Sequence, residues 1–422
     1  MKLAELQEKY PKFSYSNYSF LISGKDLEIS FVFKAGDIVF KPFLKIKDVP
    51  ESFDKGGLEN MVFNLGLIEM ISYWKSVSSP LIEIECGKIN EDQVKFWKFV
   101  IKNGLGQFFF ENKINPFVPE IVSLGKKELE IDVEKKNESF LVPMGGGKDS
   151  IVTMEILKKK EKIQCFSLNP TPAAKKVMEI GECQNPVIAE RRIDPKLLEL
   201  NQKAYLNGHT PFSAYLAFLT VLVAKVFNHK FIALSNERSA EEGNVEYQGM
   251  TINHQWSKSY EFEQIFRGYC KDYLSKEIEY FSFLRMFYEL QIASMFSKYP
   301  QYFSSFISCN EAYKTHSGTQ KPEGKWCGKC SKCLFAFLIL YPFLEEKIVV
   351  EIFGKNLFED EELIPILEEL IGVREAKPLE CVGTRKESMI ALNISWEKNK
   401  MSKSPQPALL EYFEKKILPN IK

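Results

Sequence analysis

The sequence lacks any hydrophobic run long enough to cross a membrane. Its longest apolar stretches, residues 217–227 and 334–344, fall well short of the roughly 18 residues that a spanning helix needs. Residues 1–10 alternate charged and short apolar residues, without the continuous hydrophobic segment and small-residue cleavage site of a secretory signal. These absences predict a cytoplasmic protein with no membrane partner.

The chain also lacks an excess of charge of one sign, internal repeats and low-complexity tracts. Lys plus Arg and Asp plus Glu both number 56 in 422 residues, so there is no overall positive field to attract nucleic acid. Apolar residues make up 45% of the chain, which excludes the composition of disordered proteins. We expect a folded protein without a nucleic-acid partner, and the composition leaves its oligomeric state open.

The length is that of two or three domains. Residues 18–46 alternate like three strands with two turns, and helical periodicity follows on both sides of a short strand at 81–85. Farther along, β-type runs alternate with helical segments, which favours a parallel sheet with helices on both faces. These runs are residues 139–144, 163–168, 187–193, 230–235 and 303–308. We predict an N-terminal α+β domain (1–137), an α/β domain (138–345) and a small helical C-terminal region (346–422).

The most specific local motif is the run Gly145, Gly146, Gly147, Lys148, Asp149 and Ser150, called here the glycine loop, between a predicted strand and a predicted helix (151–160). Glycines permit positive φ and a close backbone approach to a ligand, and the helix N-terminus favours an anion. Lys148 adds a cation and Ser150 a hydroxyl. The loop is no Walker A motif, because Asp149 stands where that motif requires Ser or Thr. We predict phosphate binding, with tight strand-to-helix packing as the alternative.

The glycine loop resembles the Ser-Gly-Gly-x-Asp-Ser signature of the PP-loop ATP pyrophosphatases, with Gly145 in place of the first Ser. This resemblance implies that ATP is split between its α- and β-phosphates, that Mg²⁺ is required and that a substrate oxygen becomes adenylylated. The adenosine would lie across the carboxyl ends of neighbouring strands, which nominates Asn169, Ser235 and Asn236. Glu237 would then position Mg²⁺ or substrate, unless it is a solvated loop carboxylate.

Three cysteines occur at consecutive Cys-x2-Cys spacing, Cys327, Cys330 and Cys333, and Cys309 precedes them. Four thiolates can close a tetrahedral structural zinc site, and an iron–sulfur cluster is the alternative. Four other cysteines stand alone in the sequence, and we expect each to be a free, buried small residue. They are Cys86, Cys165, Cys183 and Cys270.

Two central segments resemble the UDP-N-acetylmuramoyl-L-alanyl-L-glutamate epimerases of peptidoglycan synthesis. They are residues 235–247, Ser-Asn-Glu-Arg-Ser-Ala-Glu-Glu-Gly-Asn-Val-Glu-Tyr, and 252–259, Ile-Asn-His-Gln-Trp-Ser-Lys-Ser. The order of parts along nearly the whole chain is also similar. The resemblance implies a small-molecule UDP-muramoyl dipeptide substrate whose terminal L-Glu is inverted to D-Glu. ATP would adenylylate the α-carboxylate, which removes its charge and makes the Cα proton removable; hydrolysis would then release the product.

Three other functions stay open at this stage. The deazaguanine nitrile synthases share a PP-loop and a cysteine cluster, but they are much shorter and lack an N-terminal α+β unit. Another amidating PP-loop enzyme and a non-catalytic nucleotide-binding module are the remaining alternatives. The catalytic candidates are Lys148, Asp149, Glu237, His254 and Cys381. The last two compete for the role of the base, because imidazole titrates near pH 6.5 and a thiolate can take a proton, although a lone His or Cys is often structural.

Overall fold

The computed structural model describes residues 2–309, 311–312, 325–402 and 405–420. Its strands are β1 (Lys12–Ser23), β2 (Asp26–Ala35), β3 (Ile38–Phe40), β4 (Phe43–Ile46), β5 (Leu81–Ile84), β6 (Glu120–Ser123), β7 (Asn137–Pro143), β8 (Ile163–Leu168), β9 (Val187–Arg192), β10 (His229–Leu234), β11 (Val245–Tyr247), β12 (Met250–Ile252) and β13 (Glu279–Ser282). Its helices are α1 (Leu3–Lys9), α2 (Leu58–Trp74), α3 (Glu91–Gly104), α4 (Gly106–Glu111), α5 (Lys148–Leu157), α6 (Pro172–Ile180), α7 (Pro195–Gln202), α8 (Phe212–Val226), α9 (Tyr260–Tyr269), α10 (Glu289–Phe296), α11 (Ser331–Leu340), α12 (Glu346–Phe353), α13 (Ile364–Ile371), α14 (Arg385–Ser402) and α15 (Ala408–Tyr412).

One large mixed sheet runs through the first two thirds of the chain. Its order is β13-β10-β7-β8-β9-β4-β2-β1-β5-β6, with β3 paired to β2, while β11 and β12 form a separate hairpin. Strands β13 to β9 are parallel to one another, as the sequence predicts, and so are β1, β5 and β6. Antiparallel pairing of β4 with β9 joins these two parts. The sheet therefore continues across residue 137, and the division into three domains remains a prediction.

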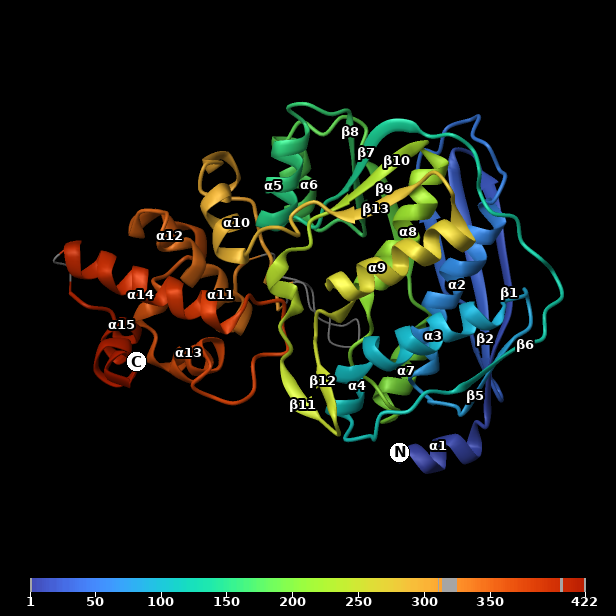
Figure 1. Cartoon of the computed structure of the whole chain (residues 1–422), viewed down its shortest axis with the longest axis horizontal. Helices are drawn as coiled ribbons and strands as arrows, with labels where there is room; N and C mark the ends of the chain where they lie inside the picture. Colours follow the sequence, from blue (N-terminus) through green and yellow to red (C-terminus); the bar gives the residue numbers. More distant parts are fainter. Residues whose placement is uncertain (1, 310, 313–324, 403–404, 421–422) are drawn as a thin grey trace.

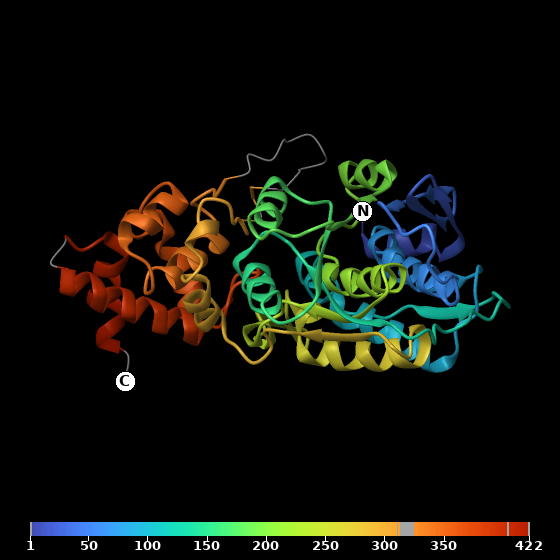
Figure 2. The ribbon, with the colours of Figure 1, turned by 90° about the horizontal axis from the view of Figure 1, so that it is seen from above.

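Neighbouring residues of the central strands enter two different hydrophobic cores. Leu141 of β7 belongs to the core that contains α2 and α8, and Val142 belongs to the core that contains α5 and α11. Side chains alternate between the faces of a strand, so both faces of this part are covered. The C-terminal helices α11 to α15 gather at one end of the molecule, and β1, β2 and β5 lie at the other (Figures 1 and 2). Among the residues described, no helix combines the length and hydrophobicity needed to cross a membrane.

The prediction of a strand at residues 303–308 is wrong. Those residues form a turn and an irregular segment, and β13, which the sequence analysis did not identify, completes the parallel sheet beside β10. Phe303 and Phe306 both pack on Phe296 of α10, so they fill a hydrophobic core without pairing as a strand. A short apolar run cannot be separated from other buried segments by its pattern alone.

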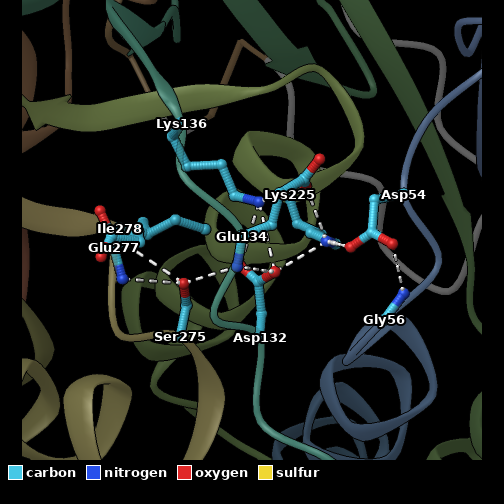
Figure 3. Close-up of polar contacts among 9 residues, drawn as sticks. All are labelled: Asp54, Gly56, Asp132, Glu134, Lys136, Lys225, Ser275, Glu277 and Ile278. Carbon is cyan, nitrogen blue, oxygen red and sulfur yellow. Dashed lines mark hydrogen bonds and ion pairs between the residues drawn. The ribbon is translucent and has the colours of Figure 1, made fainter.

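A group of charges, of which Lys225, Lys136 and Asp132 are buried, fixes the connector between β6 and β7 against α8 (Figure 3). The side chain of Lys225 is fully buried, and its Nζ atom lies 2.7 Å from Asp132 and 3.0 Å from Glu134 and also pairs with Asp54. Lys136 pairs with the same Asp132 and Glu134. Because buried charges need partners, this network specifies how the loop before α2, the connector and α8 meet.

Candidate active site

The glycine loop has the geometry of a backbone cradle at a helix N-terminus. β7 ends at Pro143 and α5 begins at Lys148, three residues earlier than the sequence predicts. Gly146 has a φ of +85°, and a Cβ atom there would lie 2.8 Å from the backbone nitrogen of Ala174, so only glycine fits. The first backbone N–H groups of α5 have no partner within the helix, which suits them to bind an anion.

A cleft of about 700 Å³ opens in front of the glycine loop. It collects residues selected from the sequence in two of the three predicted domains, 138–345 and 346–422. Those that line it are Gly145, Gly147, Asp149, Ser150, Ser235, Asn236, Glu237, His254 and Cys381. The hydroxyl of Ser235 at the end of β10 is buried without a hydrogen-bond partner, as expected for a group that contacts a ligand.

Asn169, the remaining nucleotide candidate, does not join this group. It has a φ of +46°, and its side-chain amide bonds both to the backbone carbonyl and to the backbone nitrogen of Arg191. It lines a separate cavity beside β9. These hydrogen bonds give Asn169 a structural role, because they join the end of β8 to the end of β9.

Three carboxylates meet beneath the loop. One oxygen from each of Asp149, Glu237 and Glu289 lies within 4.8 Å of the others, and the ammonium of Lys148 pairs with Asp149 and Glu289. Burial, together with repulsion from Asp149, raises the pKa of Glu289 to about 7. Burial also raises the pKa of Glu237. Carboxylate oxygens are the ligands that Mg²⁺ prefers, so these donors fit that ion.

Sequence reasoning missed Glu289, because no local motif marks it. It is the first residue of α10, far along the chain from the glycine loop, and only the packing of α10 on α5 brings its carboxylate to Lys148. The one available signal was a carboxylate in the first turn of a helix, which is common on solvated helices for its interaction with the helix dipole.

Cys381 lies far from the glycine loop in the sequence but lines the same cleft. Lys258 Nζ lies 3.3 Å from its thiol sulfur, and Lys332 donates a hydrogen bond to its backbone carbonyl. Burial alone would raise the pKa of the thiol. The Lys258 ammonium and a hydrogen bond with His254 outweigh burial and bring that pKa well below its usual value of 9.0. The lowered pKa and the neighbouring ammonium of Lys258 favour the thiolate of Cys381, the form required of a basic or nucleophilic cysteine.

The four cysteines of the predicted metal site converge. Their sulfur atoms all lie within 4.8 Å of one another, with separations of 3.8 Å for Cys309 to Cys330, 3.6 Å for Cys327 to Cys333 and 3.5 Å for Cys330 to Cys333. Tetrahedral zinc with Zn–S bonds of about 2.3 Å requires sulfur separations near 3.8 Å. The donor set therefore fits zinc.

Two of the cysteines expected to stand alone are joined. Cys165 of β8 and Cys183, just after α6, form a disulfide with their Cα atoms 6.0 Å apart, so the prediction of single thiols is wrong for this pair. Their adjacency arises because α6 returns to the end of the strand from which it started, which spacing does not reveal. Cys86 and Cys270 are free thiols, as predicted; Cys270 is buried, whereas Cys86 is only half-buried.

Comparison with known proteins finds matches to two domain models of one family. The MurL N-terminal domain matches residues 4–283, and the MurL C-terminal domain matches residues 305–417. Three curated relatives share the name UDP-N-acetyl-alpha-D-muramoyl-L-alanyl-L-glutamate epimerase. They come from a Micromonospora species (34% identical, over 81% of this chain and 76% of the relative), Salinispora tropica (33%, 81% and 74%) and Xanthomonas oryzae pv. oryzae (34%, 78% and 73%). No solved structure matches the chain.

Proposed function

The chain belongs to the MurL family of UDP-N-acetyl-alpha-D-muramoyl-L-alanyl-L-glutamate epimerases, and we propose that it inverts the terminal L-Glu of this UDP-muramoyl dipeptide to D-Glu. The protein is thus an isomerase that supplies a precursor of peptidoglycan. The observation that best supports this function is the position of the Cys381 thiolate, which shares one cleft with the glycine loop. A group able to remove a proton therefore faces a site suited to activate a carboxylate.

Activation would begin with ATP, in the manner of the PP-loop enzymes that the glycine loop resembles. An oxygen of the glutamate α-carboxylate attacks the α-phosphorus, the bond to the bridging oxygen of the β-phosphate breaks, and pyrophosphate leaves. The open N–H groups of α5 and the ammonium of Lys148 support assignment of the departing phosphates to the glycine loop. The unpartnered Ser235 hydroxyl and Asn236 support a place for the nucleoside at the end of β10.

Adenylylation prepares the Cα proton for removal. A free carboxylate resists deprotonation of its neighbouring carbon, because a second negative charge would form beside the first. The neutral acyl adenylate can instead delocalise the electron pair of the broken C–H bond into its carbonyl group. We assign proton removal to the Cys381 thiolate, whose charge Lys258 and His254 balance. Return of a proton to the opposite face gives the D-centre, and water then cleaves the acyl adenylate to the carboxylate and AMP.

Two metals fit this scheme. Asp149, Glu237 and Glu289 would hold Mg²⁺, which neutralises phosphate charge when it is bound. The four cysteines would hold zinc in a structural role, because all four positions of a tetrahedral site are occupied by protein. Cys309 also lines the cleft, so this site would fix one of its walls.

The proposed function is tested by reaction in D₂O with ATP, Mg²⁺ and the UDP-muramoyl-L-Ala-L-Glu substrate. We expect D-Glu carrying one deuterium at Cα, and no deuterium at alanine, because only glutamate has a free α-carboxylate to activate. Omission of ATP should abolish exchange. Cys381→Ser should slow exchange while adenylate formation continues. Activated dipeptide that is hydrolysed without taking up deuterium would sink the epimerase assignment and favour an amidating or ligase-type reaction.

A further inference from the structure

A hydrogen-bonded chain leads from the N-terminal part of the protein to His254. The Oε1 atom of Gln107 in α4 lies 2.6 Å from Nδ1 of His254, and Nε2 of Gln107 donates to Oε1 of Glu111 at 2.7 Å. The backbone nitrogen of His254 donates to Asn244 at 2.8 Å, which fixes the base of the side chain. Neither Gln107 nor Glu111 belongs to the glycine loop or to the segments that resemble the epimerases.

The chemistry of these groups settles the position of one proton. An ionised carboxylate can only accept hydrogen bonds, so the end of the Gln107 amide that faces Glu111 must be its NH₂ group. The other end, which faces His254, is then the carbonyl oxygen, and that oxygen can only accept. Nδ1 of His254 must therefore carry the proton in this contact, which leaves Nε2 as the ring nitrogen for the hydrogen bond between His254 and Cys381.

We propose that Gln107 and Glu111 are positioning residues that hold His254 with its proton on Nδ1, so that Nε2 takes the proton of the Cys381 thiol and leaves a thiolate. The inference rests on the proposed function in assigning proton removal to Cys381. In the resulting ion pair, the Gln107 carbonyl accepts a hydrogen bond from Nδ1–H of His254, and the Cys381 thiolate accepts one from Nε2–H. An imidazole with its proton on Nε2 instead could not receive the thiol proton at that atom.

Among the residues described, the hydrogen bonds through Gln107 to Glu111 are the contact that orients the ring of His254. The facing charged groups are Lys258 and Cys381 from the cleft and Glu111 through Gln107. The ring of His209 lies 4.7 Å from the ring of His254, and burial lowers the pKa of His209 to about 3. His209 is therefore neutral at physiological pH and adds no competing charge. Gln107 is itself buried, so water does not replace its carbonyl easily.

The first test is the position of the proton. The chain contains four histidines, so ¹⁵N spectra of histidine-labelled protein can be assigned with a His254→Gln variant. We expect a protonated Nδ1 in the native protein and loss of that signature in Gln107→Met, which keeps the length of the side chain. An unprotonated Nδ1 in the native protein, or an unchanged signature in Gln107→Met, would overturn the proposal. This readout does not depend on turnover.

The second test exchanges the two polar groups. Gln107→Met should slow deuterium exchange at the glutamate Cα by about 10- to 100-fold while pyrophosphate release stays near the native rate. The double variant Gln107→Glu with Glu111→Gln places a carboxylate against Nδ1 and an amide behind it, so it should recover most of the lost rate. Glu120→Gln, an exposed change on β6 at the far edge of the sheet, is the control and should change nothing.

These outcomes separate the two proposals. A swapped variant no faster than Gln107→Met, or a Gln107→Met variant that exchanges at the native rate, would overturn the positioning role. If the native enzyme exchanges no deuterium at all, the proposed function fails, and the ¹⁵N spectra still decide whether Gln107 fixes the His254 proton.

Discussion

The Nζ atom of Lys258 lies 3.3 Å from the thiol sulfur of Cys381, although 122 residues separate the two in the chain. This contact joins a short helical turn after the β11–β12 hairpin to the segment just before α14. The ammonium stabilises the thiolate of Cys381, which is the form that reacts with alkylating reagents. The reactivity of this one cysteine can therefore be tested.

Alkylation of Cys381 by iodoacetamide should depend less on pH between pH 7 and 9 than alkylation of an ordinary thiol, because the pKa of Cys381 lies well below 9.0. An ordinary buried thiol gains reactivity about tenfold per pH unit over that range. Lys258→Met should restore such dependence at Cys381. Mass spectrometry of the Cys381 peptide gives the rate, and Cys86, whose pKa burial raises to about 12, is the internal control. A steep pH dependence in the native protein would contradict the thiolate assignment.

Turnover should release AMP and pyrophosphate in equal amounts. Asp149→Asn keeps the size of the side chain but removes a charge that pairs with Lys148, so it should lower nucleotide cleavage by at least about 100-fold. Chromatography of the nucleotide products measures both effects. ADP and phosphate as products would mean that the glycine loop supports kinase-like chemistry instead.

Purified protein should contain one zinc per chain. Cys330→Ser removes a ligand at the N-terminus of α11 and should reduce both the metal content and the melting temperature, because binding of a structural metal stabilises the fold directly. Elemental analysis and thermal unfolding give the two values. Cys86→Ser, remote from the cluster, should keep the full metal content. Native protein that is purified anaerobically without stoichiometric metal would exclude the site.

Lys225→Met should lower the free energy of unfolding by about 3–5 kcal/mol, because it leaves the buried carboxylate of Asp132 with one fewer cation. The matched control is Lys230→Met, which breaks the exposed pair with Glu138 and should cost less than about 1 kcal/mol. Urea unfolding compares the two variants. Equal losses would show that burial does not govern the strength of these pairs.

The stability of the protein should fall between pH 6.5 and pH 4 in part through His229. Burial lowers its pKa to about 4, and the neutral ring bonds to Ser139 and Gln164. Below pH 6.5 the unfolded chain therefore binds a proton that the folded chain excludes, so the unfolding free energy decreases as the pH falls. His229→Gln should remove about 3 kcal/mol of that decrease, and His209, whose pKa burial lowers to about 3, contributes a further part. Urea unfolding at the two pH values measures it, and an unchanged difference would contradict the neutral state of His229.

Sequence patterns predict those features that local chemistry determines. The turns near Gly24 and Gly36, the strand and helix around the glycine loop and the metal-ligand spacing of Cys327 to Cys333 are each contained in a few consecutive residues. The antiparallel junction between β4 and β9 could not be predicted, because it depends on two strands far apart in the chain.

The rest of the cleft escaped prediction for the same reason. Glu289, Gln107 and Lys332 reach the site through the packing of α10, α4 and α11, and nothing in their immediate neighbours distinguishes them from surface polar residues. The segment 303–308 shows the opposite error. Its apolar residues pack into a core, but its backbone forms a turn and an irregular segment and does not pair as a strand. Local signals therefore locate the glycine loop, and tertiary packing supplies its partners.

The junction of β4 with β9 has a consequence for synthesis on the ribosome. Ile46 pairs with Ala189, so after β4 emerges about 140 further residues must be made before its open edge is covered. At translation rates of roughly 5–20 residues per second, this interval lasts roughly 7–30 s. During that time β1 and β2 can form a hairpin, but the nascent sheet keeps an unpaired strand that can pair with another chain. A ribosome that stalls before residue 187 therefore presents an aggregation-prone intermediate, for which a chaperone that shields β4 would be the natural remedy.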